Sequence, residues 1–308
     1  MIPFPTGNTV KITLVGAGAI GSLWAGALAR QGHAIHLWRR QTDTAFTLQW
    51  QGLDAPDTDT FTFCCNQPER LTSSDVILIT VKAFQVLESI KSIAPWLRTA
   101  TPVIVMHNGM GTENEVLQLL PDNPVLYATT SQAALRVDRQ SVRHTGVGPT
   151  FLGAVNRAGE QWQSLAGVLN TALAPCQWHE DIHAPQWQKL AVNCAINPLT
   201  AILQCRNGEL AAPDFTAELT GICREVAAVM TAAGYPTRSE TLLQRTLTVI
   251  QATAANYSSM QQDVANQRPT EIDAITGFLI EQAHHFQLAT PANFALWQQI
   301  KHLEQNYG

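Results

Sequence analysis

Few of the 308 residues carry a charge: Asp, Glu, Lys and Arg together make up 14%, whereas 45% of the residues are hydrophobic. A chain this apolar can bury a core, which excludes an intrinsically disordered protein. The net charge is −5, and the Lys and Arg residues form no polybasic block. We therefore expect no nucleic-acid partner, although basic side chains can still gather around an anionic cofactor.

The six cysteines lack the spacing of a metal or redox motif. They occupy positions 64, 65, 176, 194, 205 and 223, with no Cys-x-x-Cys pair and no His at zinc-finger spacing. In a chain long enough for two domains, this usage is typical of buried or reduced thiols and not of a disulfide framework. We expect no metal site.

One stretch, Ile12–Ala29, has no charge over 18 residues, as in a signal peptide or a membrane span. Four glycines interrupt it, and only one basic residue precedes it. We interpret it as a strand followed by a helix, and we expect a cytoplasmic protein with no membrane partner. Residues 1–9 contain two prolines and no periodic pattern, so they are predicted to form an N-terminal extension.

A glycine-rich turn joins the predicted strand Ile12–Val15 to the predicted helix Ala19–Gln31. The turn reads Gly16-Ala17-Gly18-Ala19-Ile20-Gly21, which is the spacing G-x-G-x-x-G. The first glycine permits the turn, the second lets a pyrophosphate approach the backbone, and the third lets the helix pack close to the strand. The N–H groups at the start of the helix then face the anion, so the segment predicts a dinucleotide site.

Two arginines, Arg39 and Arg40, follow the next predicted strand, Ala34–Trp38. An NAD site usually has Asp or Glu near this point, bonded to the ribose hydroxyls. Guanidinium groups suit a 2′-phosphate instead, because each can donate two parallel N–H bonds. The pair favours NADPH over NADH; the alternative is a solvated surface pair.

Strands and helices alternate from residue 10 to about 180, which predicts an α/β fold with a Rossmann-like, doubly wound parallel sheet. We also expect two edge strands at Phe46–Trp50 and Phe61–Cys65, and a hairpin of Ser141–His144 with Thr150–Ala154. From about 183 the strand signals end. The later segments with helical spacing are Gln186–Leu203, Phe215–Ala233, Ser239–Ala255, Ile272–Phe286 and Asn293–Gln305. This change predicts a dinucleotide-binding domain over 10–180 and an all-α domain over 181–308.

Two polar residues follow predicted strands, where ligands bind in open α/β sheets. Lys82 follows the apolar run Asp75–Val81, and it contacts a phosphate or substrate or is an ordinary strand-end lysine. Asn108 follows Pro102–His107 beside two glycines. Asn is also favoured in such a turn because it tolerates left-handed backbone angles.

A polar stripe marks the first predicted helix of the all-α region. Lys189, Asn193 and Asn197 recur every four residues and so share one face. A solvent-facing stripe is the alternative to a binding site, but Asn is a poor choice for it because its amide competes for backbone bonds. The stripe therefore favours a wet surface that binds hydroxyls and a carbonyl.

A third polar cluster contains Asn256, Ser259 and Glu271. Ser259 either binds a small polar substrate or caps the following helix. Thr270 and Asp273 have the spacing of a capping box, and at a helix N-terminus Glu271 would be stabilising for electrostatic reasons. From the residues alone, this structural interpretation of Glu271 is favoured.

In this order, these segments closely resemble the 2-dehydropantoate 2-reductase, or ketopantoate reductase, family over about residues 10–305. The most specific segments are Lys189-Leu-Ala-Val-Asn193-Cys-Ala-Ile-Asn197-Pro and Thr-Glu271-Ile-Asp, whereas 41–74 matches least clearly. The resemblance implies NADPH-dependent reduction of 2-dehydropantoate to pantoate, on the way to pantothenate and coenzyme A.

The resemblance also implies roles for residues. Lys189 would be the general acid, and Glu271 would orient the lysine or the substrate. Arg39 receives no role. Substrate or cofactor contacts would come from Asn108, Asn193, Asn197, Asn256 and Ser259, and cofactor contacts from Gly16, Ala17, Gly18, Ala19, Ile20, Gly21, Arg40, Lys82 and Asn108. Two alternatives stay open: a reductase of another 2-keto or 3-hydroxy acid, and a non-catalytic NADPH sensor. The sequence leaves monomer and homodimer equally open.

Overall fold

The computed structural model describes residues 9–53 and 55–307, which divide into two compact units. The first unit comprises the described residues up to His107 together with Thr112–Ile182. The second comprises Asn108–Gly111 and the described residues from His183 onward. The expected N-terminal extension lies outside the described residues apart from Thr9.

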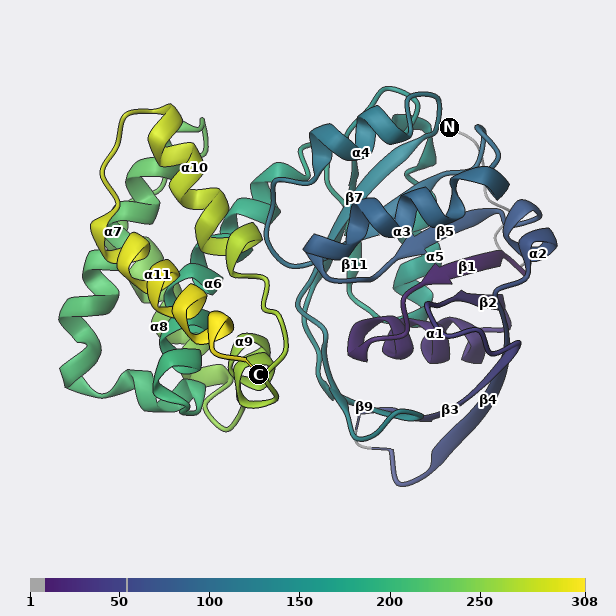
Figure 1. Cartoon of the computed structure of the whole chain (residues 1–308), viewed down its shortest axis with the longest axis horizontal. Helices are drawn as coiled ribbons and strands as arrows, with labels where there is room; N and C mark the ends of the chain where they lie inside the picture. Colours follow the sequence, from purple (N-terminus) through teal and green to yellow (C-terminus); the bar gives the residue numbers. More distant parts are fainter. Residues whose placement is uncertain (1–8, 54, 308) are drawn as a thin grey trace. The chain divides into compact units, whose positions relative to one another are not determined.

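An eleven-stranded sheet runs through the described part of the first unit (Figure 1). Its strands are β1 (Lys11–Val15), β2 (Ala34–Trp38), β3 (Ala45–Gln51), β4 (Thr58–Cys65), β5 (Val76–Ile79), β6 (Val103–Met106), β7 (Val125–Thr130), β8 (Ala133–Arg136), β9 (Ser141–Gly146), β10 (Thr150–Ala154) and β11 (Cys176–Trp178). Their order is β11-β10-β7-β6-β5-β1-β2-β4-β3-β9-β8. The central strands from β7 to β4 are parallel, which confirms the predicted Rossmann-like core.

Helices cover both faces of this parallel core. The helices of the unit are α1 (Ala19–Arg30), α2 (Pro68–Thr72), α3 (Val86–Ile93), α4 (Glu113–Leu119) and α5 (Leu165–Ala172). The core on one face is formed with α1 and α5, and the core on the other face with α3 and α4. All residues of β5 and β6 are buried, because strands covered on both sides need apolar side chains in both directions.

Helix α1 is enclosed by the same sheet. Past β4 the sheet continues through β3, β9 and β8, and this part lies on the far side of α1 from the parallel core (Figure 1). Trp50 of β3 donates from Nε1 to the carbonyl oxygen of Leu23 at 3.1 Å. A β-carbon on Gly26 would come within 2.2 Å of the Trp50 ring. The absence of charge from Ile12–Ala29 therefore reflects protein contact around the helix, and no helix in the described ranges is both long and apolar enough to cross a bilayer.

Two expectations about outer strands are wrong. The expected hairpin does not form, because β9 pairs with β8 and β3 while β10 pairs with β7 and β11, at opposite ends of the sheet. The expected edge strands form β3 and β4, but each has a neighbour on both sides. Partner choice was set by long-range pairing and not by the short Gly-rich connection.

The second unit is helical. Its helices are α6 (His183–Leu203), α7 (Thr216–Ala232), α8 (Ser239–Ala252), α9 (Ser259–Ala265), α10 (Phe278–His285) and α11 (Pro291–Gln305). Helix α6 is central and packs against α7, α8, α9 and α11. The segment expected as one helix over Ile272–Phe286 is divided into a π-helical turn, η6 (Asp273–Gly277), and α10. Helix α9 was anticipated only through the alternative that Ser259 caps a helix, and no helical spacing was identified there.

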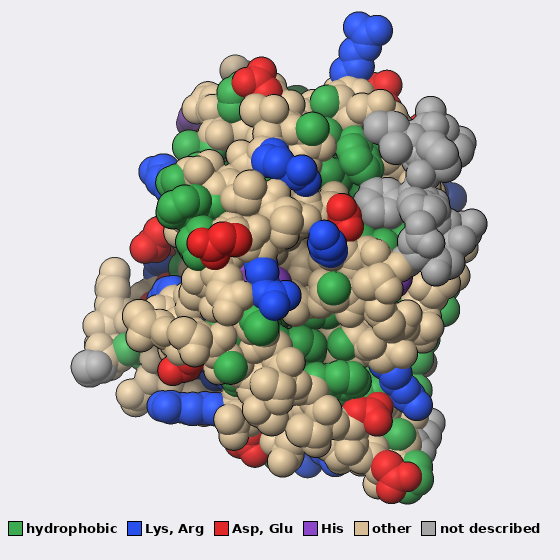
Figure 2. All heavy atoms as spheres, turned by 90° about the vertical axis from the view of Figure 1, so that its right-hand side faces the viewer, with side chains coloured by type: hydrophobic (Ala, Val, Ile, Leu, Met, Phe, Trp, Pro, Cys, Tyr) green, Lys and Arg blue, Asp and Glu red, His purple; other side chains and the backbone are tan. Residues whose placement is uncertain are grey.

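Uncharged polar side chains and backbone atoms, drawn in one colour, cover much of the face shown in Figure 2. The Lys and Arg side chains on that face are scattered among them and do not gather into one large patch. This surface accords with the charged fraction of only 14%.

Candidate functional site

The glycine turn of the first unit is fixed by close backbone approaches. Gly16 has a φ of +92°, and its N–H donates to the carbonyl oxygen of Trp38 at 3.0 Å. A β-carbon at Gly16 would lie 2.5 Å from Val81 Cγ1, and one at Gly21 would lie 2.2 Å from the Gly16 carbonyl oxygen. Both positions therefore require glycine, for a left-handed turn and for helix–strand packing respectively.

Gly18 faces open space, in contrast to the other two glycines. A β-carbon there would meet nothing within 4 Å. Gly18 is the N-cap of α1, and no side chain caps this 12-residue helix. N–H groups at such a terminus lack intrahelical acceptors and attract anions. Together with Ala17, Ala19 and Ile20, the turn offers a cradle that fits a pyrophosphate.

Neighbouring strands bring more predicted cofactor residues to the same edge of the sheet. Thr80, directly after β5, donates from Oγ1 to the Gly16 carbonyl oxygen at 3.0 Å and so braces the turn. Lys82 follows, with its ammonium 5.9 Å from the Phe84 ring centre. Arg40 follows β2 on the other side of β1 and is exposed. Thr80 was not expected from the sequence, although its hydroxyl at the end of an apolar strand was an available signal.

Three predicted site residues meet in the second unit. The Lys189 ammonium donates to Oδ1 of Asn108 at 2.9 Å. The Asn108 amide nitrogen in turn donates to Oε2 of Glu271 at 2.8 Å, and the Asn108 backbone N–H donates to Oε1 at 3.3 Å. A cation, an amide and a carboxylate are thereby linked through two side-chain hydrogen bonds.

The electrostatic setting of Lys189 suits a proton donor. Burial lowers the pKa of Lys189 to about 8, and the nearby Glu271 carboxylate opposes this effect by stabilising the ammonium. Glu271 is only 8% exposed, so its charge acts in a poorly hydrated place. A lysine with this pKa is protonated at neutral pH and yet gives up its proton more readily than a solvated lysine.

The Asn108–Gly111 loop is held against the π-helical turn η6. Met110 donates from its backbone N–H to the Ala274 carbonyl oxygen at 2.8 Å. The left-handed angles belong to Gly109 and Gly111, with φ of +81° and +104°, and not to Asn108. The idea that Asn108 is present for its tolerance of such angles is therefore wrong, and its side chain is used for hydrogen bonding. π-helical turns occur often at functional sites.

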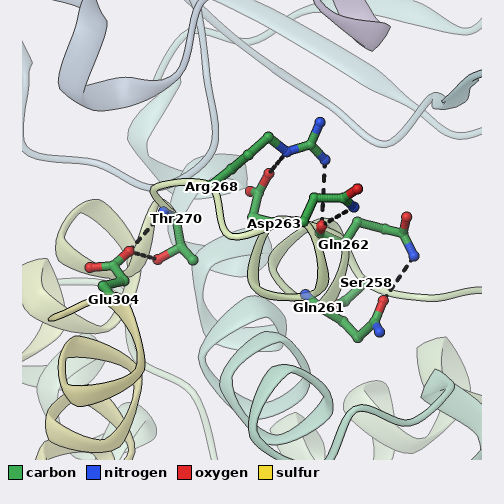
Figure 3. Close-up of polar contacts among 8 residues, drawn as sticks. Ser258, Gln261, Gln262, Asp263, Arg268, Thr270 and Glu304 are labelled. Atoms are coloured by element: carbon green, nitrogen blue, oxygen red, sulfur yellow. Dashed lines mark hydrogen bonds and ion pairs between the residues drawn. The ribbon is translucent and has the colours of Figure 1, made fainter. Parts of the chain in front are cut away.

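The segment before Glu271 is anchored to α11. Thr270 donates from both its backbone N–H and its Oγ1 to Glu304, at 2.8 and 2.7 Å (Figure 3). Asp273 instead accepts from Trp297 and Lys301, each at 2.8 Å. The expected capping box of Thr270 with Asp273 is therefore wrong, because both side chains have partners on α11.

The two asparagines of the stripe lie in α6 with Lys189, one and two turns further along. Asn197 is 7% exposed, and Asn193 is half-buried. The side-chain amides of Asn193 and Asn197 form no hydrogen bond with the described residues, which leaves their polar atoms available to a ligand. With a rise of 1.5 Å per residue, the stripe from Lys189 to Asn197 extends about 12 Å, enough for a small acid.

Ser258 lies between Asn256 and Ser259 of the third polar cluster, and it links this cluster to α6 just beyond Asn197. Ser258, and not Ser259, caps α9: its Oγ accepts from the Gln261 N–H at 3.0 Å. Thr200 of α6 donates to the same oxygen at 2.7 Å. Ser259 and Asn256 themselves are exposed. Of the two alternatives for Ser259, the helix cap is wrong, because the neighbouring Ser258 has that role.

In chemical terms, the second unit offers a protonated amine, a buried carboxylate and two asparagine side-chain amides that form no hydrogen bond within the described part of the chain. Within the described ranges, no three His, Cys, Asp or Glu side chains are grouped so that they could hold a metal ion. The first unit offers a turn suited to phosphate. Both parts suit a reaction in which a nucleotide cofactor is bound and a proton is delivered.

Two family models match this chain. The model described as ketopantoate reductase PanE/ApbA matches residues 12–157, and the one described as ketopantoate reductase PanE/ApbA C terminal matches residues 181–304.

Curated relatives match along almost the whole chain. The 2-dehydropantoate 2-reductase of Vibrio cholerae serotype O1 is 46% identical over 298 residues, covering 97% of this chain and 99% of the relative. The enzyme of the same name from Escherichia coli O157:H7 is 41% identical over 302 residues, covering 97% and 96%.

Solved structures are similar throughout the fold. The PanE/ApbA family ketopantoate reductase of Ralstonia eutropha JMP134 has a TM-score of 0.84 at 24% identity, covering 96% of this chain and 99% of that one. A D-mandelate dehydrogenase in complex with NADH has a TM-score of 0.85 at 23% identity, with the same coverage.

Proposed function

The chain belongs to the ketopantoate reductase PanE/ApbA family, and on that premise we propose that it reduces 2-dehydropantoate to pantoate with NADPH. The observation that carries the proposal is the hydrogen-bonded series from Lys189 through Asn108 to Glu271. A reduction of a keto group needs a proton at the carbonyl oxygen, and this series provides a suitable donor. When bound, NADPH supplies the hydride for the keto carbon.

Lys189 is the proposed general acid. As negative charge develops on the keto oxygen, its ammonium stabilises that charge and then donates the proton. Asn108 holds the ammonium through Oδ1 and is itself oriented by Glu271. Glu271 has a second effect, because its charge favours the protonated lysine at neutral pH. The carboxylate thus keeps the acid charged until it reacts.

In this proposal the two parts of the chain have different functions. Residues 10–180 bind the cofactor, and residues 181–308 hold the proton donor and read the substrate. In the first part, the glycine turn from Gly16 to Gly21 takes the pyrophosphate, and Lys82 and Arg40 contact further phosphate groups. In the second part, the unpaired amides of Asn193 and Asn197 bind the hydroxyl of the substrate, and Asn256 and Ser259 contact its carboxylate end.

We further propose a cytoplasmic enzyme that works as a monomer or a homodimer. Free thiols account for every cysteine in the described residues, as expected in a reducing compartment. The ketopantoate reductase of Staphylococcus aureus is described as dimeric, and it has this fold at 21% identity. Light scattering on the purified chain distinguishes a monomer of 33.6 kDa from a homodimer of twice that mass.

The direct test is a steady-state assay of the purified chain with 2-dehydropantoate and either NADPH or NADH, followed at the nicotinamide absorbance. We expect efficient turnover with NADPH and a much lower kcat/KM with NADH. A panel of other 2-keto acids tests the substrate. Faster turnover of another acid would reassign the substrate, and cofactor binding without turnover of any acid would indicate a sensor.

A further inference from the structure

The chain contains two Asn-Gly pairs, Asn108-Gly109 and Asn207-Gly208. Such a pair is prone to deamidation, because glycine has no side chain to block the attack of its backbone nitrogen on the preceding side-chain amide. The attack releases ammonia and forms a cyclic imide, which water opens to aspartate or to isoaspartate. Both pairs lie in the second unit, and their surroundings differ in the features on which this reaction depends.

The attacking nitrogen is available at the first pair and engaged at the second. Gly109 lies in a loop, and no described residue accepts a hydrogen bond from its N–H. Gly208 lies in the short helical turn η4 (Asn207–Ala211), and its N–H donates to the Ala254 carbonyl oxygen at 3.1 Å. The Gly208 nitrogen must break this bond before it can react, whereas the Gly109 nitrogen need not break one.

The side-chain carbonyl is polarised at the first pair alone. The Lys189 ammonium donates to Oδ1 of Asn108 at 2.9 Å. A cation on this oxygen makes the amide carbon more electrophilic and stabilises the negative charge that forms when a nucleophile adds. Oδ1 of Asn207 is fully buried and has no hydrogen-bond partner in the described part of the chain. Negative charge on that oxygen would stay without compensation.

Water is the second reactant, and its access also favours the first pair. Asn108 and Gly109 are half-buried, whereas Asn207 is only 7% exposed. The Asn207 amide nitrogen is held as well, since it donates to Oγ1 of Thr253 at 3.0 Å.

We propose that Asn108 is a deamidation site of the folded chain, and that Asn207 is protected by the fold. The Gly109 nitrogen loses its proton to water and bonds to Cγ of Asn108. The Cγ–Nδ2 bond then breaks, and the nitrogen takes a proton from solvent and leaves as ammonia. One water molecule adds to either carbonyl of the imide and reopens it as an acid. Water is the only co-reactant.

This modification alters the hydrogen-bonded series at the proposed acid. Nδ2 of Asn108 donates to Oε2 of Glu271 at 2.8 Å, and an oxygen in its place brings two carboxylates together. The new carboxylate also pairs with the Lys189 ammonium, which then releases its proton less readily. Deamidation should therefore inactivate the enzyme. This consequence rests on the proposed function, whereas the modification itself does not.

The test follows both Asn-Gly pairs in one sample of the purified chain. The chain is incubated at mildly alkaline pH in water enriched in heavy oxygen, and mass spectrometry of its peptides measures the label at each asparagine. In denaturant the two pairs should react at similar rates, which calibrates their local sequences. In the folded chain, Asn108 should react at least tenfold faster than Asn207. Equal rates, a faster Asn207, or an Asn108 that stays unlabelled while the denatured chain reacts would each overturn the inference.

Lys189→Met tests the effect of the ammonium on the reaction. In the folded chain it should slow labelling of Asn108 at least threefold, and in denaturant it should change nothing. Lys91→Met, which replaces an exposed lysine of α3, is the matched control and should leave both rates unaltered. An unchanged or faster folded rate in Lys189→Met would overturn the activation by lysine.

Turnover gives an independent readout of the consequence. Turnover lost by the incubated wild type should parallel the label at Asn108, and Asn108→Asp should lower kcat at least tenfold. Asn114→Asp, at an exposed position in the first turn of α4, should behave as the wild type. Full turnover after conversion of Asn108 would overturn the predicted inactivation. If the fresh wild type turns over no 2-dehydropantoate, the proposed function fails, and the labelling still decides whether Asn108 is the site.

Discussion

Gly109 lies so close to the Ala274 carbonyl oxygen that a β-carbon on it would come within 2.2 Å of that oxygen. The loop Asn108–Gly111 therefore packs directly against the π-helical turn. The N–H of the next residue, Met110, donates to the same oxygen. Asn108 immediately precedes this contact, so its two bonds to Glu271 depend on it. Backbone packing at a glycine thus sets the position of a proposed catalytic group.

Gly109→Ala should reduce both stability and turnover. Its φ of +81° disfavours any β-carbon, and the contact with Ala274 forces the loop outward. We expect a loss of about 2–3 kcal/mol in the free energy of unfolding from strain of this kind, and a turnover lower by about tenfold or more, because small misplacements of catalytic groups are costly. Gly221→Ala in α7 is the control. A β-carbon there meets nothing, and that variant should be unchanged or slightly more stable.

Lys189→Ala should retain NADPH affinity and lose at least about two orders of magnitude in kcat, the usual scale of general acid–base catalysis. The measurement is steady-state turnover beside a binding titration of NADPH. Lys91→Ala, which removes an exposed lysine from α3, should behave as the wild type. Near-normal kcat in Lys189→Ala would reject the proposed acid.

The pH dependence of kcat/KM should report Lys189. Its pKa of about 8 means that the ammonium predominates below pH 8 and is lost above it, so the reduction rate should fall on the alkaline side with a midpoint near 8. Glu271→Gln removes the negative charge that raises this pKa, and the midpoint should therefore move to lower pH. An unchanged midpoint in Glu271→Gln would show that the carboxylate does not act on the lysine.

His36 should make the fold sensitive to acid. It is 4% exposed, and its Nε2 accepts from the Gln67 N–H at 3.0 Å, so the imidazole is neutral in the folded chain. Burial, and secondarily the charge of Arg70, lowers its pKa from 6.5 to about 4. The unfolded chain binds the proton first, so stability is full above pH 6.5 and falls by up to about 3 kcal/mol as the pH drops to 4. Denaturant unfolding at several pH values should show a weaker acid loss in His36→Gln, and equal losses would contradict the assignment.

Glu225 should be a strong stabiliser of the second unit. Its buried carboxylate accepts from the N–H groups of Ala292 and Asn293, at 2.9 and 3.0 Å, where α11 begins. It also accepts from the Asn293 side chain at 2.8 Å. Glu225→Ala leaves these donors unpaired and should cost about 3 kcal/mol or more of unfolding free energy. Glu218 is an exposed residue of α7, the helix that also carries Glu225. In denaturant unfolding, Glu218→Ala should lower the free energy of unfolding by less than about 1 kcal/mol.

Much of this architecture could be predicted from local patterns. The strand, glycine turn and helix around Gly16 follow one another in sequence, and the buried parallel strands are continuous apolar runs. The four-residue spacing of Lys189, Asn193 and Asn197 places them on one side of α6 without any tertiary information. These features depend only on the residue pattern within one helix or strand, or on elements that follow one another directly in the sequence.

The remaining features depend on contacts between distant segments. The strand β10 was expected to pair with its neighbour in sequence, but β7 offers a five-residue antiparallel register that a short connection cannot reveal. Nothing near Asn108 indicated that four residues after β6 would pack with the second unit. The sequence could not show that Arg39 is largely buried, because the Phe46 ring stacked on its guanidinium belongs to another strand.

The enclosure of α1 has a consequence for synthesis of the chain. Residues 12–29 are translated before the strands that lie over the outer side of the helix, which extend to Gly146. A growing chain therefore exposes an uncharged, apolar segment while more than a hundred further codons are translated, until the strands that cover the helix have been made. Exposed apolar surface of this kind makes a folding chain prone to aggregation until the covering strands have been translated.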